Sequence, residues 1–191
     1  VAGFPLVVSI LMASLAGAML AAIFALLVLR LYANSVATGL ALTLFGLGLA
    51  ALAGSKYVGQ AAPQVATWDI PFLSQIPVVG RALFSHDPLV YLSIFTAFVI
   101  WWFLTKSRTG LILRAVGENH TSAHALGFSV RGVRFLAIIC GGALAGIGGS
   151  YLTLVQTPLF VEGMTAGRGW IALALVVFAS WRPFRVIAGA Y

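Results

Sequence analysis

Four long apolar runs without a charged side chain most constrain the fold of this chain. They lie at Leu6–Leu29, Val36–Ala53, Pro88–Thr105 and Phe135–Val155, and none contains Asp, Glu, Lys or Arg. Each has 18 or more residues, and at about 1.5 Å of rise per residue such a helix can cross a hydrocarbon core of roughly 30 Å. We therefore predict that each run is a transmembrane helix.

The composition supports lipid as the outer solvent. Apolar residues make up 61% of the chain and charged residues only 8%, whereas a soluble domain typically carries about 25% charged residues. Two shorter apolar runs follow, and the first of them, Trp170–Trp181, is either a full span or a half-membrane helix. With Val186–Tyr191 as the start of another segment, the sequence predicts an all-α, polytopic transmembrane helical bundle of about five helices plus the start of a sixth.

Residues 1–191 are expected to form a single transmembrane domain that is truncated at both ends. The chain starts at Val1 without Met and stops at Tyr191 inside an apolar run. One connection, residues 54–87, contains three prolines and so excludes a single long helix. Because this connection is also rich in apolar residues, we predict a structured loop on the outer side of the membrane. Residues 106–134 are predicted to form a cytoplasmic loop.

The orientation follows from the basic residues. A net charge of +7 would suggest nucleic acid as a partner of a soluble protein. Here the basic residues lie in short gaps between apolar runs, which is the positive-inside pattern, and no nucleic-acid partner is expected. Three basic residues fall outside: Lys56, Arg81 and Arg168. Eight fall inside if the run at 170–181 spans: Arg30, Lys106, Arg108, Arg114, Arg131, Arg134, Arg182 and Arg185.

The cytoplasmic loop contains the signature of a short amphipathic helix. Asn119 is a good N-cap residue and Gly127 a good residue just beyond a helix end. The spacing places one set of side chains on a common face: Val116, Ala123, Leu126 and Val130. The other face carries Glu118, Ser122, Ala125 and Ser129, and Ser129 is expected to cap the next membrane helix. Such a helix suits docking into a groove of a soluble partner, and the alternative is a helical loop on the membrane surface.

Other patterns indicate packing or carry little chemistry. Gly142, Gly146 and Ser150 form a small-residue stripe that lets helices approach closely in lipid, with pore lining as the alternative. His120 and His124 have the spacing of metal ligands but no convincing third ligand, so no metal is expected. Neither a GxxxxGK[ST] phosphate loop nor an acid within the four runs occurs, so the sequence offers no nucleotide-binding loop of this kind and no proton relay within the runs.

One stretch of the cytoplasmic loop resembles a known family. Arg114-Ala115-Val116-Gly117-Glu118-Asn119-His120, followed by Ala123 and Gly127, is similar to the "RAVGENP…A…GI" segment of ABC importer permeases for branched-chain amino acids, ribose and related solutes. His120 stands where the family often has Pro. The resemblance favours the branch for nucleosides and simple sugars. It extends over further stretches: Ala33–Asn34, Gly39–Leu42, Ile76–Gly80, Arg108–Leu111, Gly141–Gly146, Gly163–Ala172 and Trp181–Pro183.

The resemblance implies a multi-pass protein of the bacterial cytoplasmic membrane that imports a nucleoside or simple sugar and is not itself an enzyme. It implies three partners: a cytoplasmic ATPase subunit that holds ATP and Mg²⁺, a second permease subunit, identical or different, and an extracytoplasmic substrate-binding protein. No cofactor is implied in this chain. The coupling residues it implies are Arg114, Glu118, Asn119, His120, Ser122, Ala123 and Gly127.

Alternatives remain for the solute and for the mechanism. A branched-chain amino acid permease, a passive channel or secondary carrier, and a membrane-embedded enzyme are the competing readings. The lack of acids in the spans disfavours ion-coupled carriage, and the lack of paired carboxylates disfavours an enzyme. Polar and small residues of the second run are candidates for a solute pathway, with helix packing as the alternative: Thr38, Gly39, Thr43, Gly46 and Gly48.

Overall fold

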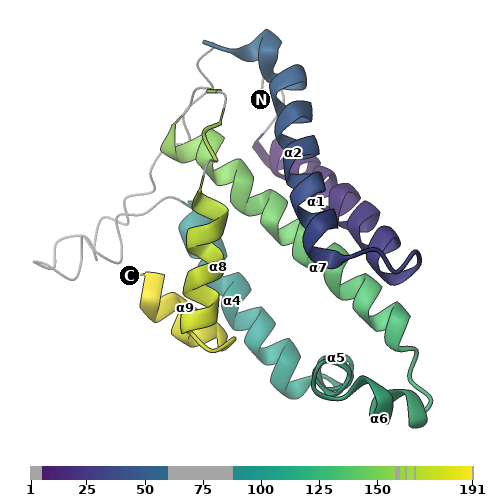
Figure 1. The fold of residues 1–191 in the computed structure, drawn as a ribbon. Coiled ribbons are helices and arrows are strands. Elements are labelled where there is room, and N and C mark those ends of the chain that lie inside the picture. The colour runs from purple at the N-terminus through teal and green to yellow at the C-terminus, as the bar shows by residue number, and fades with distance from the viewer. Residues whose placement is uncertain (1–5, 60–87, 158–159, 162, 166, 191) are drawn as a thin grey trace, which may run out of the picture. The chain divides into compact units, whose positions relative to one another are not determined.

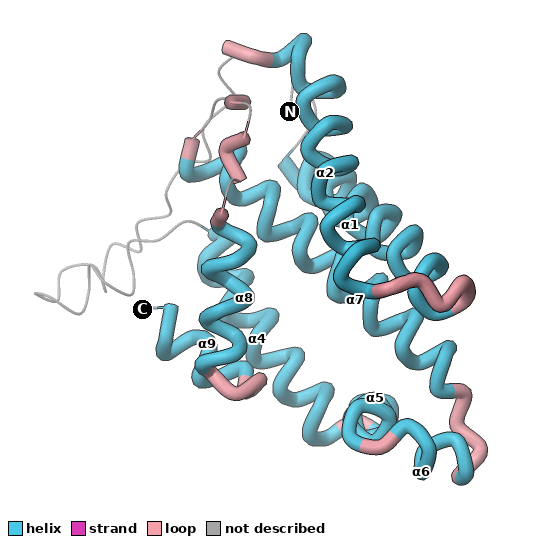
Figure 2. The backbone as a smooth tube through the Cα atoms, in the orientation of Figure 1, coloured by secondary structure: helices cyan, strands magenta, loops and turns pink. Residues whose placement is uncertain are grey.

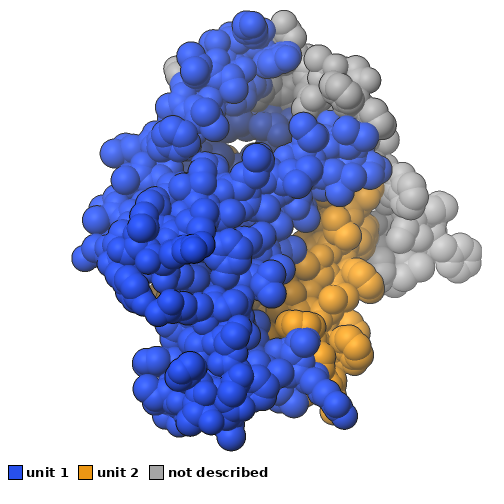
Figure 3. Space-filling view, turned by 90° about the vertical axis from the view of Figure 1, so that its right-hand side faces the viewer, with its two compact units in different colours: residues 1–63, 108–165 blue, residues 64–107, 166–191 orange. Residues whose placement is uncertain are grey.

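The computed structural model describes residues 6–59, 88–157, 160–161, 163–165 and 167–190. The chain divides into two compact units (Figure 3). Unit 1 contains Val1–Pro63 and Arg108–Thr165, and unit 2 contains Gln64–Ser107 and Ala166–Tyr191. Within the described residues almost every element is a helix (Figure 2). The predicted all-α class is therefore confirmed.

Four helices are long and apolar enough to cross a membrane, as predicted. The candidate spans are Leu6–Leu29, Ser35–Tyr57, Pro88–Lys106 and Val130–Gln156. Many large apolar side chains on them are exposed, for example Met19 and Leu44. Exposure of this kind along helices whose charged residues lie only near their ends fits lipid rather than water as the surrounding solvent. The chain is thus a multi-pass membrane protein.

Unit 1 is built on the pairing of α1 (Leu6–Leu29) with α7 (Val130–Tyr151), which lie against each other over much of their length (Figure 1). The contact is a close approach of two backbones. A Cβ atom added to Gly142 would lie 2.7 Å from the carbonyl oxygen of Gly17, and one added to Gly17 would lie 3.0 Å from the Cα of Gly146. In lipid the hydrophobic effect does not drive two helices together. Small residues at this contact instead allow close van der Waals packing of the two backbones.

The small residues of α1 recur at every fourth position: Ala13, Gly17, Ala21 and Ala25. Ala25 is fully buried, and Ala13 and Ala21 contact the positions of Gly146 and Gly142. On the opposing helix, Ser150 is also buried, and its hydroxyl donates to the carbonyl oxygen of Ile147 at 2.7 Å. Each helix therefore presents its own stripe with a period of four residues.

The second span, α2 (Ser35–Gly54), packs on α1 and continues into the short 3₁₀ helix η1 (Ser55–Tyr57). Asn34 sets its start. The Asn34 Oδ1 accepts from the backbone N–H of Val36 at 2.9 Å and of Ala37 at 3.2 Å. These bonds satisfy two of the amides that a helix N-terminus leaves unpaired.

The last span differs from its prediction at both ends. It begins at Val130, five residues before the expected Phe135, because its first turns include the charged Arg131 and Arg134. Beyond Tyr151 the chain forms the π-helix η2 (Leu152–Gln156), where a continuous α-helix was expected to Val155. Ser129 occupies the N-cap position, but its side chain makes no capping hydrogen bond, so that part of the prediction is wrong.

Unit 2 contains α4 (Pro88–Lys106), α8 (Arg168–Phe178) and α9 (Pro183–Ala190). Helices α4 and α9 pack together, and the rings of Trp101 and Phe184 lie 5.2 Å apart between their centroids. The 11 residues of α8 cover about 16 Å, roughly half of a hydrocarbon core. This helix ends three residues before the predicted Trp181, because Ser180 and Trp181 adopt left-handed backbone angles.

The predicted outer loop, residues 54–87, lies mostly outside the described residues, which resume at Pro88. Arg81 and the resembling stretch Ile76–Gly80 also lie outside them. The predicted sixth segment corresponds to α9. It begins at Pro183, a residue whose fixed φ suits the first position of a helix.

Candidate docking site on α5 and α6

The loop between the spans α4 and α7 folds into two short helices, α5 (Arg108–Glu118) and α6 (His120–Ala125). They are labelled in Figure 1 and pack on each other. Both also contact the beginning of unit 1's long helix α7. The loop is therefore an ordered part of unit 1 with a defined surface.

Asn119 separates the two helices and starts the second. Its backbone is extended, with φ −146° and ψ 98°, so the helical path breaks at this residue. The Asn119 Oδ1 accepts from the backbone N–H groups of Thr121 and Ser122, both at 3.1 Å, and from the Thr121 hydroxyl at 2.6 Å. One amide oxygen thus caps α6 as the sequence predicts.

Gly127 closes the other end of α6 in a Schellman arrangement. The Phe128 N–H donates to the Ala123 carbonyl oxygen at 3.2 Å, and the Gly127 N–H donates to that of His124 at 2.9 Å. This pattern requires a left-handed residue, and Gly127 has φ +85°. Glycine adopts this angle without a Cβ clash, which explains its place here.

Two small apolar side chains anchor the helices. Val116 is 1% exposed and Ala123 is 2% exposed. The sequence predicted that Leu126 would share their buried face, and this is wrong because Leu126 is 75% exposed. The helix ends at Ala125, and Leu126 has ψ 4°, so the helical spacing that the prediction assumed does not extend to it.

The residues predicted to contact a partner lie mainly on the exposed surface. Ala123 is the exception, since it is buried and shapes the loop from within. Six are exposed: Arg114, Glu118, Asn119, His120, Ser122 and Gly127. The exposed residues come from both helices and the turns around α6. A surface of this kind, polar and rigidly capped, is suited to docking.

Sequence reasoning missed α5 as a separate helix. Its signal was present, because Ile112 and Leu113 are half-buried and Val116, three to four positions on, is buried. That spacing marks one face of a helix. The prediction instead grouped Val116 with the residues of α6, although the break at Asn119 puts them on different helices.

The solute-pathway candidates all lie on α2, and the structure gives them different environments. Thr38 is buried, and the Thr43 hydroxyl donates to the Gly39 carbonyl oxygen of its own helix at 2.8 Å. Nothing lies within 4 Å of a Cβ placed at Gly46 or Gly48. The open positions therefore face away from the described packing, while Thr38 faces into it.

Among the described residues, no group of three or more His, Cys, Asp and Glu side chains lies close enough together to hold a metal ion. The two histidines of α6 nevertheless line a hollow beside α1 and α7. Cys140 lies exposed on α7.

Replacing Asn119 with alanine is expected to destabilise α6 by about 1 kcal/mol, because two backbone amides lose their acceptor. Amide hydrogen exchange of Thr121 and Ser122 measures the change and should be faster in the variant. Asn119→Asp is the control, because it keeps an acceptor oxygen and should exchange as the wild type does. Equal exchange in the alanine variant would mean that the cap does not hold the helix.

Comparison with known proteins gives a consistent picture. All residues from 1 to 191 match the family described as "Branched-chain amino acid transport system / permease component". Over 92% of its length the chain is 43% identical to the "Putative glucose ABC transporter permease protein" of Haloferax volcanii, covering 54% of that protein. It is 35% identical to the nucleoside ABC transporter permease protein of Lactococcus lactis, over 92% of this chain and 57% of the relative.

A guanosine ABC transporter permease protein of Bacillus subtilis is 32% identical over 95% of this chain and 59% of its own length. The chain therefore spans about half the length of the curated relatives that it matches. No solved structure matches it.

Proposed function

Since this chain belongs to the branched-chain amino acid transport permease family, we propose that it forms part of the membrane-spanning subunit of an ABC importer for a simple sugar or nucleoside. The relatives are named for glucose, nucleosides and guanosine. The absence of charged residues from the cores of the four predicted spans supports a neutral solute of this kind. A branched-chain amino acid remains the second candidate because the family description names it.

The observation that carries this proposal is the pair of helices α5 and α6. They lie between two membrane spans along the chain, are held by the buried Val116 and Ala123, and leave a polar surface exposed. We infer that a separate ATPase subunit receives this surface in a groove. Closure of the ATPase would then move the loop together with α7, on which it packs.

In this proposal α5 and α6 act together as the coupling element, with Glu118 and Ser122 in direct contact with the ATPase. ATP and Mg²⁺ are bound and consumed on the ATPase, and this chain makes or breaks no covalent bond. A second permease subunit and an extracytoplasmic substrate-binding protein complete the importer. Thr38 and the open glycine positions of α2 remain candidates for the solute pathway.

The proposal requires Glu118 to lie in the cytoplasm, and labelling of single cysteines tests this. The exposed Cys140 is first replaced by alanine. A membrane-impermeant maleimide should then label Val58→Cys, an exposed site beyond α2, in intact cells. It should label Glu118→Cys only after the membrane is opened. Labelling of Glu118→Cys in intact cells would place the loop out of reach of an ATPase and end the proposal.

Purification of the intact protein under mild conditions tests the partner directly. We expect an ATPase subunit to accompany it, and we expect solute to stimulate ATP hydrolysis in the reconstituted complex. Uptake of a nucleoside or sugar that persists after removal of ATP would instead favour a passive channel or secondary carrier.

A further inference from the structure

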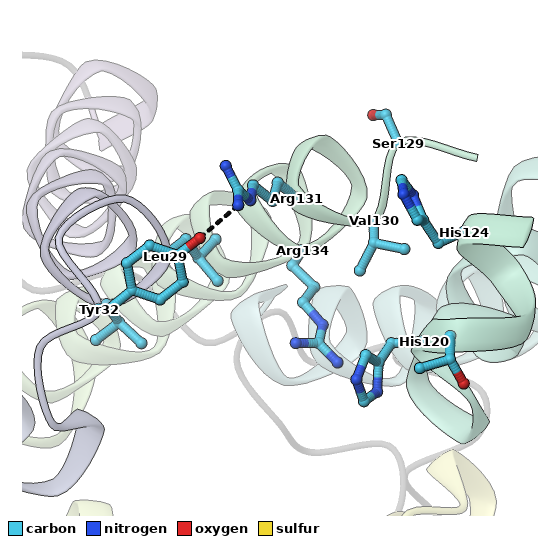
Figure 4. A pocket seen from close by; sticks show the side chains of 10 residues that line it. Leu29, Tyr32, His120, His124, Ser129, Val130, Arg131 and Arg134 are labelled. Atoms are coloured by element: carbon cyan, nitrogen blue, oxygen red, sulfur yellow. Dashed lines mark hydrogen bonds between the residues drawn. The ribbon is translucent and has the colours of Figure 1, made fainter. Parts of the chain in front are cut away.

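A hollow of about 680 Å³ lies in unit 1 where α6, the end of α1 and the start of α7 meet. Figure 4 shows its side chains: His120 and His124 come from α6, Tyr32 follows α1, and Arg131 and Arg134 come from the first turns of α7. These segments are far apart in the sequence. The hollow is therefore a product of the fold, and it shares only His120 with the exposed docking residues.

The polar side of the hollow is rich in basic groups. Arg131 and Arg134 each carry a full positive charge, and the two histidines add ring nitrogens that can donate hydrogen bonds. No acidic side chain is among the described residues that line it. Two guanidinium groups that line one hollow without a carboxylate favour the binding of an anion there.

The two arginines differ in how they are held. Arg131 donates a hydrogen bond to the Tyr32 hydroxyl, and its guanidinium lies 5.6 Å from the centre of the Tyr32 ring. This contact fixes its position and still leaves other N–H donors. The Arg134 side chain extends toward His120 (Figure 4) and has no hydrogen-bond or ion-pair partner among the described residues. Arg131 is thus held in place by Tyr32, and the guanidinium of Arg134 is available to bind a ligand.

Part of the lining of the hollow is apolar. Val28 and Leu29 are near the end of the span α1, and Val130 is the first residue of α7. The hollow thus lies at the level where two membrane spans end, on the side that the charge pattern assigns to the cytoplasm. A lining with both apolar side chains and basic donors matches the two parts of a phospholipid, its acyl chains and its headgroup.

We propose that this hollow binds the phosphate headgroup of one anionic phospholipid, with Arg131 and Arg134 on the phosphate oxygens and Val28, Leu29 and Val130 against the upper acyl chains. His120 and Thr121 of α6 face the same headgroup. The bound lipid would connect the coupling element to the membrane ends of α1 and α7. An acidic segment of a partner protein would satisfy the arginines but would leave the apolar wall uncovered.

Native mass spectrometry of the intact protein tests this site. The protein is released from nanodiscs of phosphatidylcholine doped with phosphatidylglycerol. We expect one phosphatidylglycerol to be retained by the wild type. Arg131→Gln/Arg134→Gln should lower its retention about tenfold. The matched control Arg30→Gln/Arg182→Gln removes two exposed arginines outside the hollow and should retain the lipid.

Two further variants separate binding from folding. Arg134→Gln alone leaves the Arg131–Tyr32 contact intact and should still weaken retention. Arg131→Lys/Arg134→Lys keeps both charges and should restore part of it. Because the readout is lipid retention, failure of ATP coupling or uptake would not affect the result.

Three outcomes would overturn the proposal. Equal retention in the wild type and Arg131→Gln/Arg134→Gln would show that the lipid sits elsewhere. Competition by inorganic phosphate at the same concentration as the lipid would point to a free anion. The third outcome concerns the ATPase. If the side chains of the hollow were shielded from solvent only when the ATPase is bound, and no lipid were retained, the hollow would bind an acidic segment of the partner instead.

Discussion

Replacing Gly146 with leucine is expected to break the pairing of α1 and α7 and to leave little folded protein. A Cβ atom at this position would overlap the carbonyl oxygen of Ala13 and lie 2.9 Å from its carbonyl carbon. Both are backbone atoms of a neighbouring helix, so no side-chain rotation relieves the clash. Overpacking of this kind costs about 3 kcal/mol or more, a large share of the stability of a typical domain.

Gly148→Leu provides a matched control on the same helix. Nothing lies within 4 Å of a Cβ atom at Gly148, which is exposed. Both variants add the same side chain two residues apart, so they share any effect on helix propensity. We expect Gly148→Leu to give a monodisperse peak in size-exclusion chromatography with a wild-type melting temperature. Gly146→Leu should give a low yield of aggregated protein.

A stable, monodisperse Gly146→Leu protein would mean that the two helices do not approach as closely as described. Gly142→Leu gives an independent check, because a Cβ atom there would lie 2.7 Å from the Gly17 carbonyl oxygen. The two glycines are four residues apart on one face, so both substitutions should fail together. The measurement therefore tests the seam and not a single contact.

The four spans could be predicted from sequence because lipid imposes a simple rule. A segment without charge has to satisfy its backbone within itself, which makes it helical, and its length has to match the bilayer. Leu6–Leu29 is a helix over the range that its apolar run indicates. The N-cap at Asn119 and the end of α6 at Gly127 could also be predicted, because each depends only on residues within a few positions in the sequence.

The predictions that failed depended on contacts or backbone changes that no local pattern specifies. The switch to a π-helix at Leu152 occurs inside an apolar run and changes neither its length nor its hydropathy. The end of α8 depends on left-handed angles at Ser180 and Trp181, which are residues that rarely adopt them. Neither Ser nor Trp marks such an end as glycine does at Gly127.

The helix that packs against the small-residue stripe of α7 could be identified only from the structure. Small residues at Gly142 and Gly146 indicate that some helix approaches, but they do not identify it. The complementary residues Ala13 and Gly17 lie more than a hundred positions earlier. The same limit applies to Tyr32 and Arg131, which are 99 positions apart and meet beside α6. The basic hollow is therefore a property of the tertiary structure alone.

Replacing Ser122 with tryptophan is expected to lower ATP-driven uptake by at least about tenfold, which corresponds to a loss of roughly 1.4 kcal/mol of coupling free energy. Ser122 is exposed on α6, and no hydrogen bond of its hydroxyl is found among the described residues. Its backbone N–H, which Asn119 caps, is unchanged by the substitution. The added ring should therefore leave the loop folded and obstruct only the approach of the ATPase.

Ser122→Ala is the matched control, since it removes the same hydroxyl without adding volume. Uptake by this variant should match the wild type. Basal ATP hydrolysis should persist in Ser122→Trp but should no longer be stimulated by solute. The ATPase itself is unchanged, whereas its contact with α6 is obstructed. If both variants transport at the wild-type rate, the exposed face of α6 lies outside the docking groove. The coupling role would then have to move to α5, where Arg114 and Glu118 are also polar and exposed.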